Sequence, residues 1–218
     1  MNIKLTRIIM DLGKAMLFML ALVLANASYA NQTNPQLLLE KVTTTTFERI
    51  EVEQQSIAAN PDHLRRIIEQ ELMPHIDYKF AAFKVLGKHF RAVPKADIPE
   101  FVEEFRQYLI SNFAVALANY GGQELFEPVK DTDNLKSMTV KAIIRDADRP
   151  DIHINFKLRK IKKTNEWKTY DLVAEGISLL SSKQSEFASI IRQQGIQGVI
   201  EVMKNKNGEP LNIAANSR

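Results

Sequence analysis

Two carboxylates, Asp171 and Glu175, come closest in type and spacing to a catalytic pair. They lie four positions apart near the end of a predicted strand, Trp167 to Ala174. Buried together, they would provide a general acid and a general base. Carboxylates at the end of a strand also orient a turn or cap the segment that follows. The sequence leaves both roles open, and we expect the structural one.

Histidine provides the other catalytic candidate. His75 and Asp77 have the spacing of a general base and its orienting residue, but we favour a surface pair at a helix boundary, because no nucleophile lies nearby. None of the four histidines has the spacing of a zinc site, and the chain contains no cysteine. We therefore expect no metal ion and no cofactor.

Longer catalytic motifs are missing from the sequence. It contains no Gly-x-Ser-x-Gly elbow, no P-loop and no Gly-x-Gly-x-x-Gly turn. The sequence therefore indicates a protein that is not an enzyme.

Residues 1–30 have the features of a cleavable secretory signal peptide. Three basic residues stand at its start, and Ala15 to Ala25 is an apolar run too short to span a bilayer stably. Ser28 and Ala30 are the small residues that a signal peptidase reads. An uncleaved membrane anchor is the alternative, but we expect export to the periplasm. Because the chain has no cysteine, it has no site for a lipoprotein anchor.

Charge and length bound the exported part. The 218 residues carry a formal net charge of +3. Removing residues 1–30, which hold three basic residues and one acidic residue, leaves about +1. This balance gives no support to nucleic-acid binding and predicts no strong, charge-driven adhesion to anionic lipid. Residues 31–204 are long enough for a single domain, and a polar tail follows over residues 205–218.

Helical periodicity dominates the first half of this domain. Asn-Pro pairs at residues 34–35 and 60–61 predict two helix starts, with Asn as the cap and Pro at the first helical position. Gly87 and the glycine pair 121–122 are expected to end later helices. The predicted helices cover residues 35–58, 61–73, 78–86 and 95–120.

The second half changes to the period of a β-sheet. In the segment 151–161, apolar Ile152, Ile154, Phe156 and Leu158 alternate with polar residues, which predicts a strand with one covered and one solvated face. The other predicted strands cover residues 124–129, 136–145 and 167–174.

Helices close the chain. Ser181, with Gln184 three residues later, has the pattern of a capping box, and Gly195 interrupts the apolar pattern that follows. The order of helices, antiparallel strands and helices predicts an α+β domain.

Several short segments carry a resemblance to a known family. Residues 167–178, with the sequence WKTYDLVAEGIS, are followed by Gln184, Phe187 and the pair 195–196. Upstream, the segments are QTNP (32–35), ANPD (59–62), QELMP (70–74), KVLG (84–87) and FRQYL (105–109). In these segments the sequence resembles the MlaC family of periplasmic phospholipid-binding proteins, also called toluene-tolerance auxiliary proteins. The resemblance covers essentially the whole mature chain and departs from the family at Pro99 and in the turn 146–150.

The resemblance implies a fold and a function. The fold is a twisted antiparallel sheet of about four strands, wrapped by helices and enclosing an apolar cavity for the acyl chains of a phospholipid. The function is a soluble carrier, expected to be monomeric, that shuttles lipid between an outer-membrane lipoprotein–porin complex and an inner-membrane ABC-type transporter and so maintains outer-membrane lipid asymmetry. The residues expected to bind lipid are Phe105, Tyr108, Val140, Ile152, Ile154, Phe156, Leu158, Leu172 and Ile177.

The physical chemistry of lipid sets a demanding condition for such a carrier. A diacyl lipid has roughly thirty methylene groups at about 0.8 kcal/mol each, so exposing both tails to water costs more than ~20 kcal/mol. A carrier must therefore cover nearly all of that surface, while a phosphate left at the mouth needs no buried cation. We expect indifference to the head group. Periodicity alone does not distinguish a hollow interior from a filled one, and a periplasmic chaperone with an apolar groove for polypeptide is the alternative function.

Overall fold

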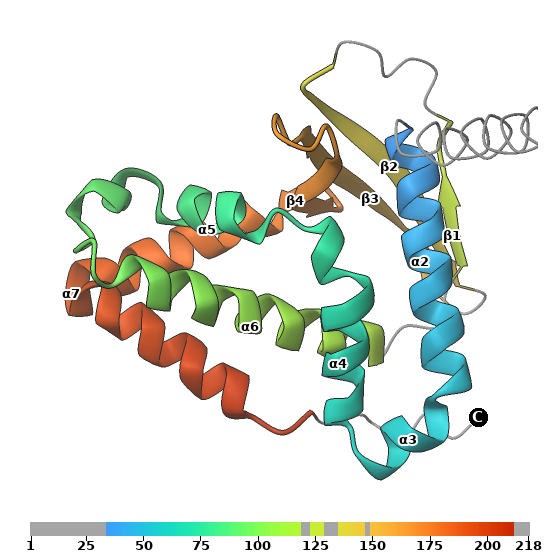
Figure 1. The fold of residues 1–218 in the computed structure, drawn as a ribbon, viewed down its shortest axis with the longest axis horizontal. Coiled ribbons are helices and arrows are strands. Elements are labelled where there is room, and N and C mark those ends of the chain that lie inside the picture. The colour runs from blue at the N-terminus through green and yellow to red at the C-terminus, as the bar shows by residue number, and fades with distance from the viewer. Residues whose placement is uncertain (1–33, 119–122, 129–134, 147–148, 212–218) are drawn as a thin grey trace, which may run out of the picture.

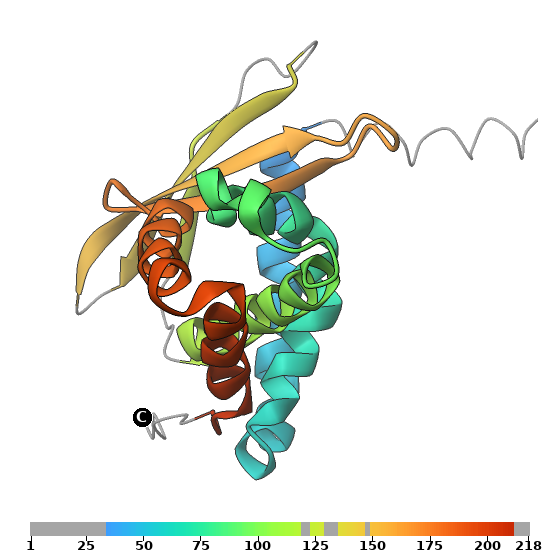
Figure 2. The same cartoon turned by 90° about the vertical axis from the view of Figure 1, so that its left-hand side faces the viewer.

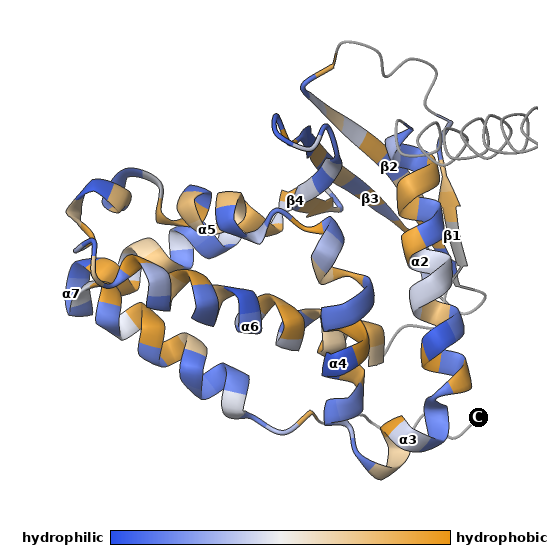
Figure 3. Ribbon diagram, in the orientation of Figure 1, coloured by the Kyte–Doolittle hydropathy of each residue, from blue (hydrophilic) through white to orange (hydrophobic). Residues whose placement is uncertain are grey.

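The computed structural model describes residues 34–118, 123–128, 135–146 and 149–211. The predicted signal peptide, residues 1–30, lies outside this range. Figure 1 shows helices α4 to α7 on one side of the molecule and the sheet on the other, with α2 lying over the sheet. In Figure 3 the helices carry alternating hydrophobic and hydrophilic bands, as expected of helices that bury one face.

The helices match the predicted segments closely. Asn34 caps the first of them, since its side chain accepts the N–H groups of Gln36 and Leu37. A break at Glu53 divides this segment into two helices. Pro99 lies in the first turn of a later helix, where the missing N–H of proline loses no helical hydrogen bond. The helices are α2 (Pro35–Val52), α3 (Gln54–Ala59), α4 (Asp62–Glu71), α5 (Tyr78–Leu86), α6 (Ile98–Ala118) and α7 (Leu179–Gly208), with 3-10 turns η2 (Met73–His75) and η3 (Gly87–Ala92).

The closing helix α7 differs from its prediction at both ends. Its N-cap is Ser178, whose hydroxyl accepts the N–H of Ser181, so the predicted cap at Ser181 is wrong. The helix also continues through residues 205–208, which were assigned to the polar tail, and Leu211 beyond them is buried. Gly195 interrupts α7 as expected, with φ 70° and ψ −170°.

The sheet is a simple antiparallel meander. Neighbouring strands in the sequence are neighbours in space, in the order β1-β2-β3-β4-β5. The sheet has five strands and not about four, because the turn after β4 places Glu175 and Gly176 at φ 48° and 79° and returns the chain as a short extra strand. The strands are β1 (Gln123–Phe126), β2 (Ser137–Asp146), β3 (Arg149–Lys160), β4 (Trp167–Ala174) and β5 (Ile177–Ser178).

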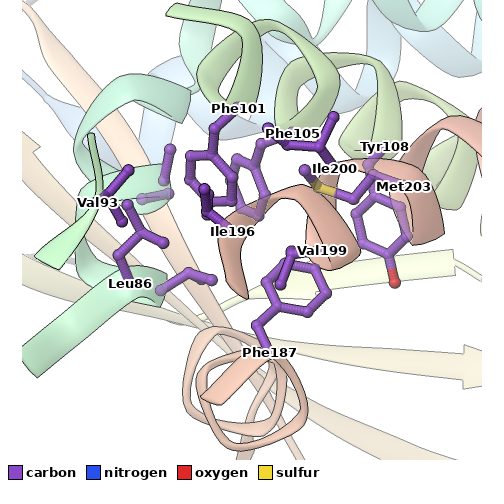
Figure 4. Packing of buried hydrophobic residues seen from close by; sticks show 13 residues of the cluster. Leu86, Val93, Phe101, Phe105, Tyr108, Phe187, Ile196, Val199, Ile200 and Met203 are labelled. Carbon is purple, nitrogen blue, oxygen red and sulfur yellow. The ribbon is translucent and has the colours of Figure 1, made fainter. Parts of the chain in front are cut away.

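The buried hydrophobic residues form separate clusters. The largest joins α5, α6 and α7, and Figure 4 shows side chains of α6 facing those of α7 across it. A second cluster lies between α4 and α6 and includes Leu211, and the third lies between α2 and the sheet. Figure 2 shows α5 and α7 on the side of the sheet turned away from α2. Among the described residues, no helix combines the length and hydropathy needed to cross a membrane.

Candidate functional site

The pairing register places all the strand residues predicted to bind lipid on one face of the sheet. Val140, Phe156 and Leu172 lie directly opposite one another on β2, β3 and β4. Side chains of directly paired residues point to the same side of a sheet. The residues of this surface, which we call the apolar face, are Phe126, Met138, Val140, Ala142, Ile144, Ile152, Ile154, Phe156, Leu158, Leu172, Ala174 and Ile177.

One row of the apolar face crosses the whole sheet. Phe126, Ala142, Ile154, Ala174 and Ile177 come from β1 to β5 in order, each paired with the next. Bulky and small side chains alternate along it. The side chains of the two alanines therefore rise less above the sheet than the larger apolar side chains beside them.

Exposure to solvent increases along the apolar face, from Val140 and Leu158 toward Ile152 and Ile177. Val140 and Leu158 are fully buried, since they pack with Leu39 of α2. Ile152 is 39% exposed and Ile177 is 62% exposed. Helix α2 therefore covers one end of the apolar face, and the described residues leave its other end open.

Two aromatic rings lie where this cover becomes incomplete. Phe126 and Phe156 stack with their centroids 6.0 Å apart, and both are only partly buried. They pack against the cluster between α2 and the sheet. Phe126 was not predicted to be part of the site, nor were Ala142 and Ile144, although the alternation along residues 138–144 would have identified the two β2 residues.

The two predicted helical residues lie elsewhere. Phe105 and Tyr108 are buried in the cluster between α5, α6 and α7, where Tyr108 packs against Phe187 at a centroid distance of 6.1 Å (Figure 4). The ammonium group of Lys183 lies 5.3 Å from the centre of the Tyr108 ring. The structure therefore does not bring these two residues onto the apolar face.

Asp171 has a structural role. Its carboxylate accepts hydrogen bonds from Lys157 Nζ at 3.1 Å, Ser178 Oγ at 2.8 Å and the backbone N–H of Leu180 at 3.1 Å. Glu175 accepts the backbone N–H of His153 on the neighbouring strand. Asp171 therefore caps the following helix, as expected of one of these carboxylates, whereas Glu175 joins the turn after β4 to strand β3.

The other catalytic candidate is also engaged in local structure. The Asp77 carboxylate accepts the N–H of Phe80 at 3.2 Å, which caps α5, and forms an ion pair with Arg159 at 3.3 Å. Burial lowers the pKa of His75 below its ordinary value. No cluster of three or more metal-ligating side chains occurs in the part of the chain that the structure describes.

Comparison with known proteins identifies relatives. Residues 40–205 match the model of the MlaC protein family. The intermembrane phospholipid transport system binding protein MlaC of Haemophilus influenzae is 29% identical over 197 residues, which are 89% of this chain and 92% of that protein. A phospholipid-binding protein from Ralstonia solanacearum, solved in complex with a phospholipid, superposes with a TM-score of 0.70 at 18% identity and covers 80% of this chain and 97% of its own. This likeness supports the predicted α+β fold.

Proposed function

Since the chain belongs to the MlaC family, we propose that it is a non-enzymatic phospholipid carrier and that the apolar face holds the acyl chains of its cargo. The observation that carries the proposal is the partly covered row of apolar side chains from Phe126 to Ile177. A surface of this kind costs free energy when water covers it, and the cost disappears when hydrocarbon does.

The arrangement of the core supports this proposal. The cluster under α2 is separate from the two helical clusters, so the sheet does not share one continuous core with α6 and α7. Hydrocarbon tails lying on the apolar face would add contacts for Ile154 and Phe156, which are only partly buried. One relative named above is described as the binding protein of an intermembrane phospholipid transport system, and the other as a phospholipid-binding protein.

The proposed carrier works in the periplasm, as a monomer and without a cofactor. It takes phospholipid between an outer-membrane lipoprotein–porin complex and an inner-membrane ABC-type transporter, and so maintains the lipid asymmetry of the outer membrane. Support comes from the family and from the predicted signal peptide at residues 1–30. The structural roles of Asp171 and Glu175 support a function without catalysis.

Extraction of the purified protein tests the proposal. Organic solvent should release phospholipid in about one-to-one ratio with protein, and native mass spectrometry should show the same complex intact. Protein purified in parallel from the same cells and known to bind no lipid serves as the control. Lipid-free protein that instead binds unfolded polypeptide would favour the alternative function, a periplasmic chaperone.

A further inference from the structure

An exposed pair of aromatic rings lies on the helical side of the molecule. Phe83 on α5 and Phe90 on η3 contact each other edge to face, with ring centroids 5.2 Å apart. They remain 40% and 38% exposed despite this contact. Figure 1 shows this part of the chain at the opposite end of the molecule from α2. Two large rings that lie side by side and partly in solvent are a candidate interaction surface.

The segment that carries the aromatic pair is rich in basic residues. No aspartate or glutamate occurs between Asp77 and Asp97. The cations of this stretch are exposed, and none forms an ion pair with a described carboxylate. They are Lys79, Lys84, Lys88, Arg91 and Lys95. A net charge near zero for the whole domain therefore conceals a local concentration of positive charge.

The aromatic pair and the cations of its segment, which we call the patch, lie beside the start of α7. The side-chain amide of Gln184 donates to the carbonyl oxygen of Lys84 at 2.9 Å, which holds the first turns of α7 against the end of α5. Those turns follow directly after Ile177, at the open end of the apolar face. Contact made through the patch would therefore be made close to that end.

The composition of the patch favours a lipid surface over a protein partner. Protein interfaces are enriched in arginine and depleted in lysine. Here lysine predominates, with Arg91 as the single arginine of the set. A lysine and an arginine contribute equally to attraction toward an anionic membrane, and aromatic rings settle at the level of the head groups.

We propose that Phe83, Phe90 and the cations of their segment form a docking surface for a bilayer containing anionic phospholipid. The two rings enter the head-group region, while Lys88 and Arg91 extend along it toward the phosphates. The contact rests on the proposed carrier function for its role in the cell. Binding to vesicles can nevertheless be measured by itself, without any transfer of lipid.

Flotation with vesicles tests the docking surface. Purified protein should float with vesicles of phosphatidylethanolamine and phosphatidylglycerol, less so as salt is added, and not with vesicles of phosphatidylcholine alone. The double variant K88Q/R91Q should bind about 25-fold more weakly, at about fivefold for each charge removed. The double variant F83S/F90S should lose about tenfold or more.

Matched controls make the test specific. K162Q/K163Q removes the same charge from the exposed turn between β3 and β4, and Val52→Ser removes an apolar side chain that is 84% exposed on α2. Both should bind as the wild type does. A thermal melt would reveal whether F83S/F90S unfolds. If it does, the comparison of K88Q/R91Q with K162Q/K163Q still tests the docking surface.

Three results would overturn the docking surface while leaving the carrier function intact. They are equal binding to neutral and anionic vesicles, equal weakening in K162Q/K163Q and K88Q/R91Q, and retention on immobilised polyglutamate without any binding to vesicles. The last result would indicate an acidic protein partner. Purified protein that contains no phospholipid but binds vesicles normally would contradict the carrier function and leave the docking surface in place.

Discussion

The carboxylate of Asp171 accepts the backbone N–H of Leu180 at 3.1 Å and so ties strand β4 to the first turn of α7. The same carboxylate accepts the hydroxyl of Ser178, which is the N-cap of that helix. One buried side chain thus holds the sheet and the closing helix together at the open end of the apolar face. This junction suggests the first test.

Asp171→Asn should lower the free energy of unfolding by about 2–4 kcal/mol. The amide cannot accept from all three donors, and its NH₂ group places hydrogens against Lys157 Nζ or Ser178 Oγ. Urea denaturation measures the change. Glu175→Gln, at an exposed carboxylate whose acceptor oxygen is kept, is the control and should cost less than about 1 kcal/mol. Equal costs would contradict the role given to Asp171.

Ile154→Asp should reduce the phospholipid that co-purifies by about tenfold or more, because it places a carboxylate in the middle of the apolar face. Asn155→Asp puts the same charge on the neighbouring residue, which points to the opposite face, and should leave lipid content unchanged. Phospholipid is quantified after extraction, and circular dichroism checks that both variants fold. Normal lipid content in Ile154→Asp would count against the site.

The mixture of bound head groups should follow the composition of the membranes offered. No lysine or arginine is among the buried residues of the described part of the chain, where the buried polar side chains are Thr46, Ser111 and Asp171. No buried cation is therefore at hand to select one phosphate-linked group. Native mass spectrometry after incubation with mixed vesicles reads out the distribution. A single head group bound out of proportion to its share would rule out this indifference.

Gly195→Ala should destabilise the protein by about 1–3 kcal/mol. No neighbouring atom lies within 4 Å of the position an added Cβ would take, so the cost comes from φ 70° and not from a clash. Gly208→Ala provides the matched control, since that position is equally open and does not have a positive φ. Its effect should stay within about 0.5 kcal/mol by thermal or urea unfolding. A harmless Gly195→Ala would mean that α7 can straighten without loss.

Stability should fall between neutral and mildly acidic pH in part because of His75. Burial lowers the pKa of His75 in the folded state, so the unfolded chain binds its proton at a higher pH. The folded protein keeps its full stability above the unfolded pKa of about 6.5 and loses some as the pH falls toward the lower folded pKa. His75→Gln should reduce this loss, as measured by urea midpoints at about pH 7.5 and about pH 5. His153→Gln, at an exposed histidine, should retain it.

Much of the fold follows from local sequence signals. Helix α5 begins and ends where it was predicted, because Asp77 caps it and Gly87 ends it. Strand β4 also has the predicted bounds. The cap at Ser181 failed because its partner Gln184 makes a distant contact, donating to the carbonyl of Lys84. A local motif gave way to tertiary structure there.

The candidate site was predictable to a similar degree. Alternation along β3 identified the side of the strand that forms the apolar face, since the side-chain period of a strand is fixed by its geometry. Phe105 and Tyr108 were expected to bind lipid, but the structure buries both between α5, α6 and α7. Helix α6 is apolar on two sides, so Phe105 packs toward α7 while Ile110 packs toward α4. Which neighbour meets which side depends on contacts between distant segments.

Helix α7, the last helix of the chain, packs against the much earlier helices α5 and α6. This contact sets the order in which the helical core can be assembled. The α7 residues Phe187, Val199 and Met203 complete the cluster that α5 and α6 begin, and Gln184 and Asn207 reach back about a hundred positions to Lys84 and Glu104. The meander, by contrast, pairs each strand with the next. A chain that emerges N-terminus first can therefore form its hairpins early, but it leaves the apolar sides of α5 and α6 accessible to chaperones until the last helix has appeared.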